Sequence, residues 1–258
     1  MKLATSSVMF EDQTIEQVCE RVAGLGLAGL DIWAPFENCV HLEDIRKRLG
    51  GKGLRELMTR HGLDVAAFTI YDGNKLSQYW ELIRDFGGGV VVRSSEAGRL
   101  TDPKELVPRM RALFEQLKPD IELAEKCDAR LAIENYGGEV LSSVDTFKAF
   151  VELNPNPERL GIALAPYHLQ YYETPIEDVI RIAGSQIFFF YAWQHGADVA
   201  QMPGLGPVDF TPLIRALAEI NYAHYSSIFM HGHLPTDETE TAVSKSREYL
   251  LNINSDQR

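Results

Sequence analysis

The stretch Ile187-Phe-Phe-Phe-Tyr-Ala-Trp-Gln-His195 is an apolar run that ends in polar side chains. Three other runs in the second half of the chain have the same form. A parallel strand buried on both faces is a near-continuous apolar run, and a barrel of such strands carries its chemistry at their carboxyl ends. The pattern therefore predicts one shared site at one end of a parallel barrel. The other runs are Leu131-Ala-Ile-Glu-Asn-Tyr136, Gly161-Ile-Ala-Leu-Ala-Pro-Tyr-His168 and Ser227-Ile-Phe-Met-His-Gly-His233.

Short apolar segments recur about every thirty residues along the whole chain, as βα units require. The length of 258 residues suits one barrel of this kind, for which about 250 is typical. We therefore predict an α/β fold, a (β/α)8 TIM barrel of eight parallel strands surrounded by helices, with residues 1–258 as a single domain. The expected strands are residues 2–9, 28–33, 64–70, 89–93, 129–134, 160–165, 186–193 and 225–230.

Amphipathic helical patterns separate these strands, and several carry start or stop signals such as Asp102-Pro103 or Gly62. Residues 34–53 are the long exception, a predicted loop that would form part of a lid. The expected helices are residues 14–25, 53–61, 75–86, 103–126, 144–153, 175–182, 210–220 and 238–251.

A doubly wound open sheet also alternates strands and helices, and its nucleotide-binding form has a glycine-rich turn after the first strand. Here that turn reads Phe10-Glu-Asp-Gln13 and has no glycine. Helix capping explains Gly24, Gly26 and Gly29, which lie between a helix and the next strand. The barrel is therefore favoured.

The composition excludes several classes of partner. A net charge of −12 argues against nucleic acid, because a grip on phosphate backbones needs dense Lys and Arg. The three cysteines fit neither a zinc spacing nor a disulfide framework. Apolar runs of about seven residues are far shorter than the ~20 that span a membrane, and the first residues lack a signal-peptide pattern. We expect a soluble, unprocessed, cytoplasmic protein without a membrane partner.

Several segments carry a resemblance to a known group: Gly24-Leu-Gly-Leu-Ala-Gly-Leu-Asp31, Ile133-Glu-Asn135, Gly161 to His168, Gly204-Leu-Gly-Pro-Val-Asp-Phe210 and Tyr249-Leu250. Together they resemble the xylose isomerase-like barrel superfamily, which includes sugar isomerases and epimerases, inosose dehydratases and endonuclease IV. The resemblance covers essentially the whole chain. It implies a barrel that acts on a carbohydrate, and it is consistent with a homo-oligomer.

The same resemblance implies a divalent cation, such as manganese, magnesium, cobalt or zinc, at the ends of strands five to eight. Glu134 matches the strand-five glutamate, and His168 matches a strand-six histidine that contacts substrate or metal. Neither alanine nor phenylalanine can coordinate an ion, so the usual site is not present residue for residue. The three mismatched ligand positions fall on Ala165, on Tyr191 or Gln194, and on Phe229.

Two further histidines leave the question of a metal open. His231 lies two residues beyond Phe229 and His195 four beyond Tyr191, so each could share a strand face with the position it follows. Imidazole suits zinc, iron, nickel or cobalt. One alternative is a relocated metal site; the other is a metal-free pocket in which the histidines bond to a sugar. The relocated set would be Glu134, His168, His195 and His231.

Glu134 and His168 are the expected catalytic residues. Glu134 ends an apolar strand, where burying a carboxylate is costly without a partner, and this favours a role as metal ligand or general base. His168 follows a proline that indicates a fixed turn, and an imidazole passes protons near neutral pH. Aromatic and polar residues at the same end are expected to bind the substrate. They are Trp33, Tyr136, Tyr167, Tyr191, Trp193 and Gln194.

Arg93 is the one cation expected at this end, so an uncharged sugar, keto-sugar or cyclitol fits better than a sugar phosphate. The predicted function is a sugar isomerase or epimerase that abstracts a proton next to a carbonyl. Isomerisation, epimerisation and elimination share an enediolate intermediate, so a lyase acting on a keto-sugar is the runner-up. The alternative is a catalytically degenerate sugar-binding or accessory barrel that has lost the metal site. An endonuclease is disfavoured by the acidic charge and the missing zinc ligands.

Overall fold

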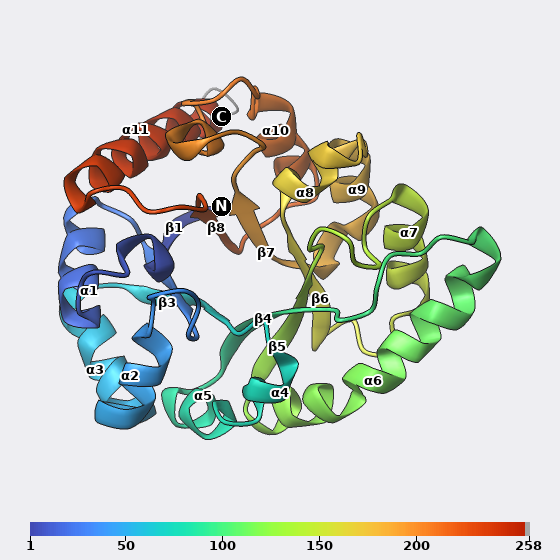
Figure 1. Cartoon of the computed structure of the whole chain (residues 1–258), viewed down its shortest axis with the longest axis horizontal. Helices are drawn as coiled ribbons and strands as arrows, with labels where there is room; N and C mark the ends of the chain where they lie inside the picture. Colours follow the sequence, from blue (N-terminus) through green and yellow to red (C-terminus); the bar gives the residue numbers. More distant parts are fainter. Residues whose placement is uncertain (256–258) are drawn as a thin grey trace.

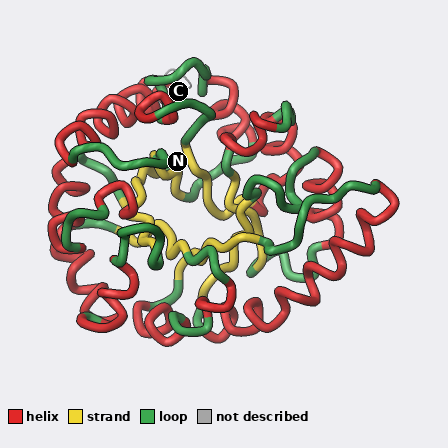
Figure 2. The backbone as a smooth tube through the Cα atoms, in the orientation of Figure 1, coloured by secondary structure: helices red, strands yellow, loops and turns green. Residues whose placement is uncertain are grey.

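Eight parallel strands close into a barrel that helices surround (Figure 1). The computed structural model describes residues 1–255. Each strand pairs with the next along the chain, and β8 pairs with β1, so the barrel has no open sheet edge. In Figure 2 the strands form an inner ring inside an outer ring of helices. The predicted (β/α)8 TIM barrel is confirmed.

The strands lie close to their predicted positions. One difference is at β1, predicted over residues 2–9, which ends at Ser6 and is followed by a 3-10 turn, η1. The Ser7 hydroxyl accepts a hydrogen bond from the Trp33 backbone N–H and so takes the place of the next ladder carbonyl. The strands are β1 Lys2–Ser6, β2 Gly29–Trp33, β3 Asp64–Thr69, β4 Gly89–Ser94, β5 Ala129–Glu134, β6 Leu160–Leu164, β7 Ile187–Ala192 and β8 Tyr225–Ile228.

The helices pack apolar faces against the outside of the strands. Two short helices differ from the prediction: α2 lies in the expected loop 34–53, and α8 directly follows β6. The predicted helix 75–86 is divided into α4 and α5. No helix among the described residues is long and apolar enough to cross a bilayer. The α-helices are α1 Ile15–Gly24, α2 His41–Arg48, α3 Gly50–His61, α4 Gly73–Leu76, α5 Trp80–Phe86, α6 Leu106–Lys126, α7 Val144–Leu153, α8 Pro166–Tyr171, α9 Ile176–Ala183, α10 Thr211–Glu219 and α11 Thr236–Ser255.

Candidate active site

The two residues predicted to be catalytic meet at the carboxyl ends of the strands, the end of the barrel that we call the mouth. Glu134 ends β5 and is only 1% exposed. His168 lies in α8, and its Nε2 is 3.5 Å from Glu134 Oε1. Pro166, with its fixed φ, begins α8 immediately after β6 and so places the imidazole over the mouth. The proline therefore starts a helix, where the sequence indicated a turn.

Three buried polar atoms in this part of the mouth have no hydrogen-bond partner: Glu134 Oε2, His168 Nε2 and Trp193 Nε1. The rings of His168 and Trp193 lie edge to face with centroids 5.3 Å apart. A buried polar group left unpaired costs about 1–3 kcal/mol, and native structures contain few of them. Their concentration at one place marks the position where a polar ligand would find partners.

Aromatic rings wall this position. Tyr167 stacks on Trp193 at 4.0 Å with an interplanar angle of 7°, and Tyr136 lies 5.0 Å from the His168 ring. His231, just beyond β8, packs edge-on against Trp193 at 4.9 Å. Burial lowers the pKa of His231, which favours its neutral form. These predicted substrate-binding aromatics therefore line one shared surface.

Three other predicted residues do not join this cluster. Gln194 donates to the Met202 carbonyl and accepts from the Val208 N–H, so its amide holds the loop after β7. His195 is exposed, and its ring stacks on the ring of Tyr167. Arg93 lies near the end of β4, as expected, but its side chain is buried and forms two ion pairs. Its partners are Asp120 on α6 and Glu96.

A second buried carboxyl, Asp31 on β2, lies inside the barrel beneath the mouth. It accepts hydrogen bonds from Thr69 at 2.6 Å, Ser6 at 2.7 Å and the Trp33 indole at 2.6 Å. The Thr69 hydroxyl is also hydrogen-bonded to the Tyr191 hydroxyl, 2.9 Å away, and either group can donate. Burial raises the pKa of Asp31 to about 7, although the three hydrogen bonds oppose the shift. We call Asp31, Ser6, Thr69 and Tyr191 the hydroxyl network.

Tyr71 follows β3, and its ring lies 5.1 Å from that of Trp33 and 5.8 Å from that of Tyr136. Burial, with the charge of Glu134 as a further cause, raises the pKa of Tyr71 well above its usual value. Burial and the charge of Asp31 do the same for Tyr191. Both phenols therefore stay protonated near neutral pH. Asp31, Thr69 and Tyr71 were not among the residues predicted for the site; the lone carboxylate in the apolar segment 29–33 was the available signal.

A cavity of about 180 Å³ adjoins the hydroxyl network and has Trp33, Thr69 and Tyr71 in its wall. A larger cavity of about 730 Å³ lies at the opposite end of the barrel, where Gly89 and Tyr225 begin their strands. Chemistry in such barrels occurs at the carboxyl ends of the strands, and the unpartnered atoms lie there. The mouth is therefore the candidate site.

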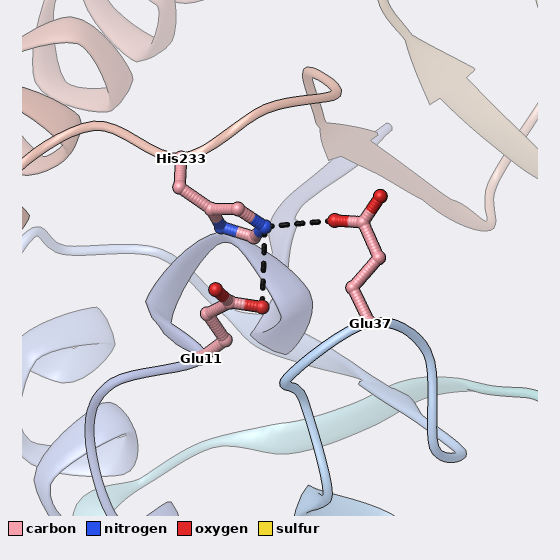
Figure 3. A group of neighbouring side chains, drawn as sticks. All are labelled: Glu11, Glu37 and His233. Atoms are coloured by element: carbon pink, nitrogen blue, oxygen red, sulfur yellow. Dashed lines mark hydrogen bonds and ion pairs between the residues drawn. The ribbon is translucent and has the colours of Figure 1, made fainter.

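At the rim of the mouth, side chains from three loops meet on one imidazole (Figure 3). His233 Nε2 lies 2.8 Å from Glu37 Oε2 and 3.1 Å from Glu11 Oε2. Within residues 1–255 this is the one group of three or more His, Cys, Asp or Glu side chains whose ligand atoms all lie within 4.8 Å of one another. The structure therefore does not assemble the relocated set. His233, Glu37 and Glu11 instead tie together the loops that follow β8, β2 and η1.

The model of the xylose isomerase-like TIM barrel family matches residues 19–253. The chain belongs to this family. Similar solved structures include the IolI protein with a bound zinc atom (17% identity, TM-score 0.75, 99% of both chains), D-psicose 3-epimerase in the presence of D-fructose (16%, 0.71, 100% of this chain and 98% of the other) and Escherichia coli 3-keto-D-glucoside 4-epimerase (17%, 0.71, 96% and 99%). At these identities the likeness shows the fold. No curated protein sequence matches the chain.

Two of the family's ligand positions hold side chains without a donor atom. Phe229 is 1% exposed and stacks on Trp33 with centroids 5.2 Å apart. Ala165 offers only its backbone, whose N–H and carbonyl are both bonded to the Asn135 side chain. A hydrocarbon side chain cannot bind a cation, and the space around these positions is filled by packed groups.

The third mismatched position of the xylose isomerase-like site falls on Tyr191 or Gln194. The Tyr191 hydroxyl is hydrogen-bonded to Thr69, and the Gln194 amide is bonded to the Met202 carbonyl and the Val208 N–H, so both side chains are already engaged. Glu134 is thus the one matching ligand of the four. These residues do not fit the metal ion of the family.

Proposed function

We propose that this barrel is an enzyme that abstracts a proton next to the carbonyl of a sugar, keto-sugar or cyclitol. The observation that carries the proposal is the convergence of three buried, unpartnered polar groups, those of Glu134, His168 and Trp193. A carboxylate base, an imidazole and an N–H donor are the groups that a hydroxy-ketone needs. Relatives of the same fold act on D-psicose and on 3-keto-D-glucosides, which supports this substrate class.

In the proposed reaction the Glu134 carboxylate takes the proton from the carbon beside the carbonyl. The C–H electron pair forms a C=C bond, and the carbonyl π pair moves onto oxygen. His168, 3.5 Å from Glu134, relays a proton to or from the substrate hydroxyls. Return of the proton to the neighbouring carbon gives isomerisation, return to the opposite face gives epimerisation, and loss of an adjacent hydroxyl gives elimination.

The aromatic rings around Glu134 and His168 favour an uncharged ligand. Tyr136, Tyr167 and Trp193 offer ring faces to the C–H side of a sugar. Arg93, the cation expected at the mouth, is already paired with two carboxylates and is buried. Phosphate recognition therefore has no support from this residue.

A second candidate function is a sugar-binding or accessory barrel without turnover. It is favoured by Ala165 and Phe229, which remove ligands that the family uses. The same aromatic pocket would then bind a sugar and leave its C–H bonds intact. Solvent exchange of substrate hydrogens separates the two functions, because only an enzyme labilises the C–H bond.

The test is incubation of the wild type in D2O with D-psicose, D-tagatose, D-fructose, a 3-keto-glucoside and an inosose, followed by NMR. We expect deuterium incorporation next to the carbonyl of one of them, and a loss of about 10²–10⁴-fold in Glu134→Gln. Glu122→Gln, an exposed site on α6, is the matched control and should retain full activity. Full activity of Glu134→Gln would show that the proton-transfer assignment is wrong, and sugar binding without exchange would favour the accessory barrel.

A further inference from the structure

We propose that Glu11, Glu37 and His233 form a binding site for a divalent transition-metal ion of the zinc type at the rim of the mouth (Figure 3). One carboxylate oxygen of each glutamate and Nε2 of the histidine would be its three protein ligands, a donor set that suits zinc or cobalt. None of these residues stands at a position that matches the family's metal site. The proposal does not depend on the proposed function.

The first argument is distance. Nε2 of His233 lies 2.8 Å from Oε2 of Glu37 and 3.1 Å from Oε2 of Glu11. Zinc holds nitrogen and oxygen ligands at about 2.0–2.2 Å, so neighbouring ligand atoms of a tetrahedral site are about 3.3–3.6 Å apart. Each contact would therefore lengthen by roughly half an ångström. Small rotations of the three side chains supply that space, and no loop has to move to a new position.

The second argument is charge. Within residues 1–255, neither Glu11 nor Glu37 forms an ion pair with a lysine or an arginine, and both share His233 as partner. With a neutral imidazole the three groups carry two negative charges, and with an imidazolium they carry one. A dication balances both carboxylates and binds the imidazole in its neutral form. The net charge of −12 adds a field that attracts cations to the protein.

The third argument is the position of the imidazole nitrogen. Nε2 of His233 carries at most one proton, yet two carboxylate oxygens lie within 3.1 Å of it. One N–H shared between two acceptors cannot point straight at both, and a hydrogen bond weakens as its angle departs from linearity. An ion on Nε2 would bond to both oxygens at full strength. The arrangement therefore suits a metal ion better than a proton.

Asn38 holds one ligand in the orientation that such a site needs. Its Nδ2 donates to Glu11 Oε1 at 2.9 Å, and its backbone N–H donates to Glu11 Oε2 at 3.2 Å. Oε1 is thereby directed at Asn38, and Oε2 lies at His233. Metal-binding carboxylates commonly have such a supporting partner outside the ligand set. Asn38 is therefore expected to be a positioning residue for the ion.

The cluster is closed on one side and open on the other. The Glu11 side chain is only 11% exposed, whereas those of His233 and Glu37 are 35% and 55% exposed. An ion can enter from the open side, and water can fill the coordination position that the protein leaves free.

An ion at this place would fasten three loops of the mouth to one another. Glu11 follows η1, Glu37 follows β2 and His233 follows β8, and His233 is 196 positions from Glu37 along the chain. Phe36, the neighbour of Glu37, lines the 180 Å³ cavity. The proposed role of the ion is therefore to hold the loops that border this cavity.

The first experiment is calorimetric titration of the chelator-treated protein with Zn²⁺. We expect one equivalent bound with a Kd below about 10 µM, and an affinity at least about 100-fold lower in His233→Ala and in Glu37→Gln. Asn38→Ala removes only the support of a ligand and should cost about tenfold. His195→Ala and Glu20→Gln are matched changes at exposed positions outside the cluster and should bind zinc as the wild type does.

Two results of this titration would overturn the proposal. One is no zinc bound by the wild type at about 100 µM Zn²⁺, a concentration about tenfold above the expected Kd. The other is the same affinity in the wild type, His233→Ala and Glu37→Gln, which would show an adventitious surface site. Glu37 is exposed, so its substitution leaves the fold intact even where His233→Ala does not.

Glu134→Gln separates the rim from the strand ends. Its zinc affinity should equal that of the wild type, because Glu134 lies outside the cluster. Loss of the bound equivalent in Glu134→Gln, with retention in His233→Ala, would assign the ion to the strand ends and overturn the proposal. Zinc binding is measured without a substrate. If no sugar exchanges its hydrogens, the proposed function fails while the zinc result stands.

The second experiment measures whether the ion fastens the loops. Zn²⁺ at about 100 times its Kd should raise Tm by about 5–10 °C in the wild type and not in His233→Ala. Hydrogen exchange should slow together in the loops that follow η1, β2 and β8. An equal rise of Tm in His233→Ala, or slower exchange in only one of the three loops, would overturn the proposal.

Discussion

The two sides of the barrel mouth treat buried polar groups in opposite ways. On the β1–β3 side, Asp31 accepts three hydrogen bonds, and the groups that donate to it are fixed in turn. On the β5–β7 side, a carboxylate, an imidazole and an indole are equally buried, yet each has an atom without a partner. Polar groups on the first side bond to one another, whereas those on the second side keep atoms that a ligand would bind under the proposed function. Substitutions should therefore separate stability from activity.

The largest expected effect on stability is on the β1–β3 side, where the buried polar groups have hydrogen-bond partners. Asp31→Ala leaves the donors Thr69, Ser6 and Trp33 unpaired in a buried place, so the free energy of unfolding should fall by roughly 3–5 kcal/mol. Urea denaturation followed by circular dichroism measures it. Glu134→Gln is the comparison on the other side and should change stability by less than about 1 kcal/mol. Equal losses of unfolding free energy in the two variants would show that the two sides of the mouth do not differ in their contribution to stability.

The next largest expected effect is the pH dependence of the stability that Asp31 contributes. Burial raises the pKa of Asp31 from 3.8 to about 7, so the folded protein holds this proton more tightly than the unfolded chain does. The resulting stability is complete below pH 4 and is lost as the pH rises through 7. Relative to Asp31→Asn, the wild type should lose roughly 2–4 kcal/mol between pH 4 and pH 8. A difference in urea midpoint that stays flat over this range would contradict the raised pKa.

A matched pair of tryptophans sharpens the comparison further. The Trp33 indole donates to Asp31, whereas the Trp193 indole has no partner. Trp33→Phe should therefore cost about 1–3 kcal/mol of unfolding free energy, and Trp193→Phe less than about 1 kcal/mol. Calorimetry with the sugar that the D2O exchange experiment identifies should show an affinity about tenfold lower in Trp193→Phe than in the wild type. The reverse pattern would show that the β5–β7 side, and not the β1–β3 side, has the structural role.

The smallest expected effect is at the rim. His233, Glu11 and Glu37 form ion pairs in which the histidine and Glu37 are 35% and 55% exposed, and such pairs contribute about 0–1 kcal/mol. His233→Ala should lower stability by less than about 1 kcal/mol, with a smaller loss at high salt because exposed charges are screened. Denaturation at two salt concentrations checks this. A loss above about 2 kcal/mol would show that the rim cluster holds the loops as firmly as the interior network holds the strands.

Much of the fold could be predicted because a strand buried on both faces requires a continuous apolar run in the sequence. Eight such runs at even spacing are compatible with few topologies. Glu134 and His168 were found for the same reason, since a polar side chain at the end of an apolar run stands out. The hydroxyl network was missed. Its hydrogen bonds join residues 25 to 122 positions apart, and short hydroxyl side chains in strands carry no periodic signal.

Other differences have local causes. Gln194 was expected to bind substrate because it follows an apolar run, but the loop after β7 folds back and uses both ends of its amide. The short helix α8 was missed because Pro166 fits a turn and a helix start equally well. His233 gains its two carboxylate partners only where three loops meet, and no local sequence pattern signals such a meeting.

The stack of Phe229 on Trp33 also limits which residues can replace Phe229. A mutation of Phe229 to glutamate, the residue of the family's metal site, would bury a carboxylate against an indole with no ion to neutralise it. Such an unpaired buried charge costs several kcal/mol, a large share of the stability of a domain. A glutamate at this position would therefore need a cation or a donor introduced together with it.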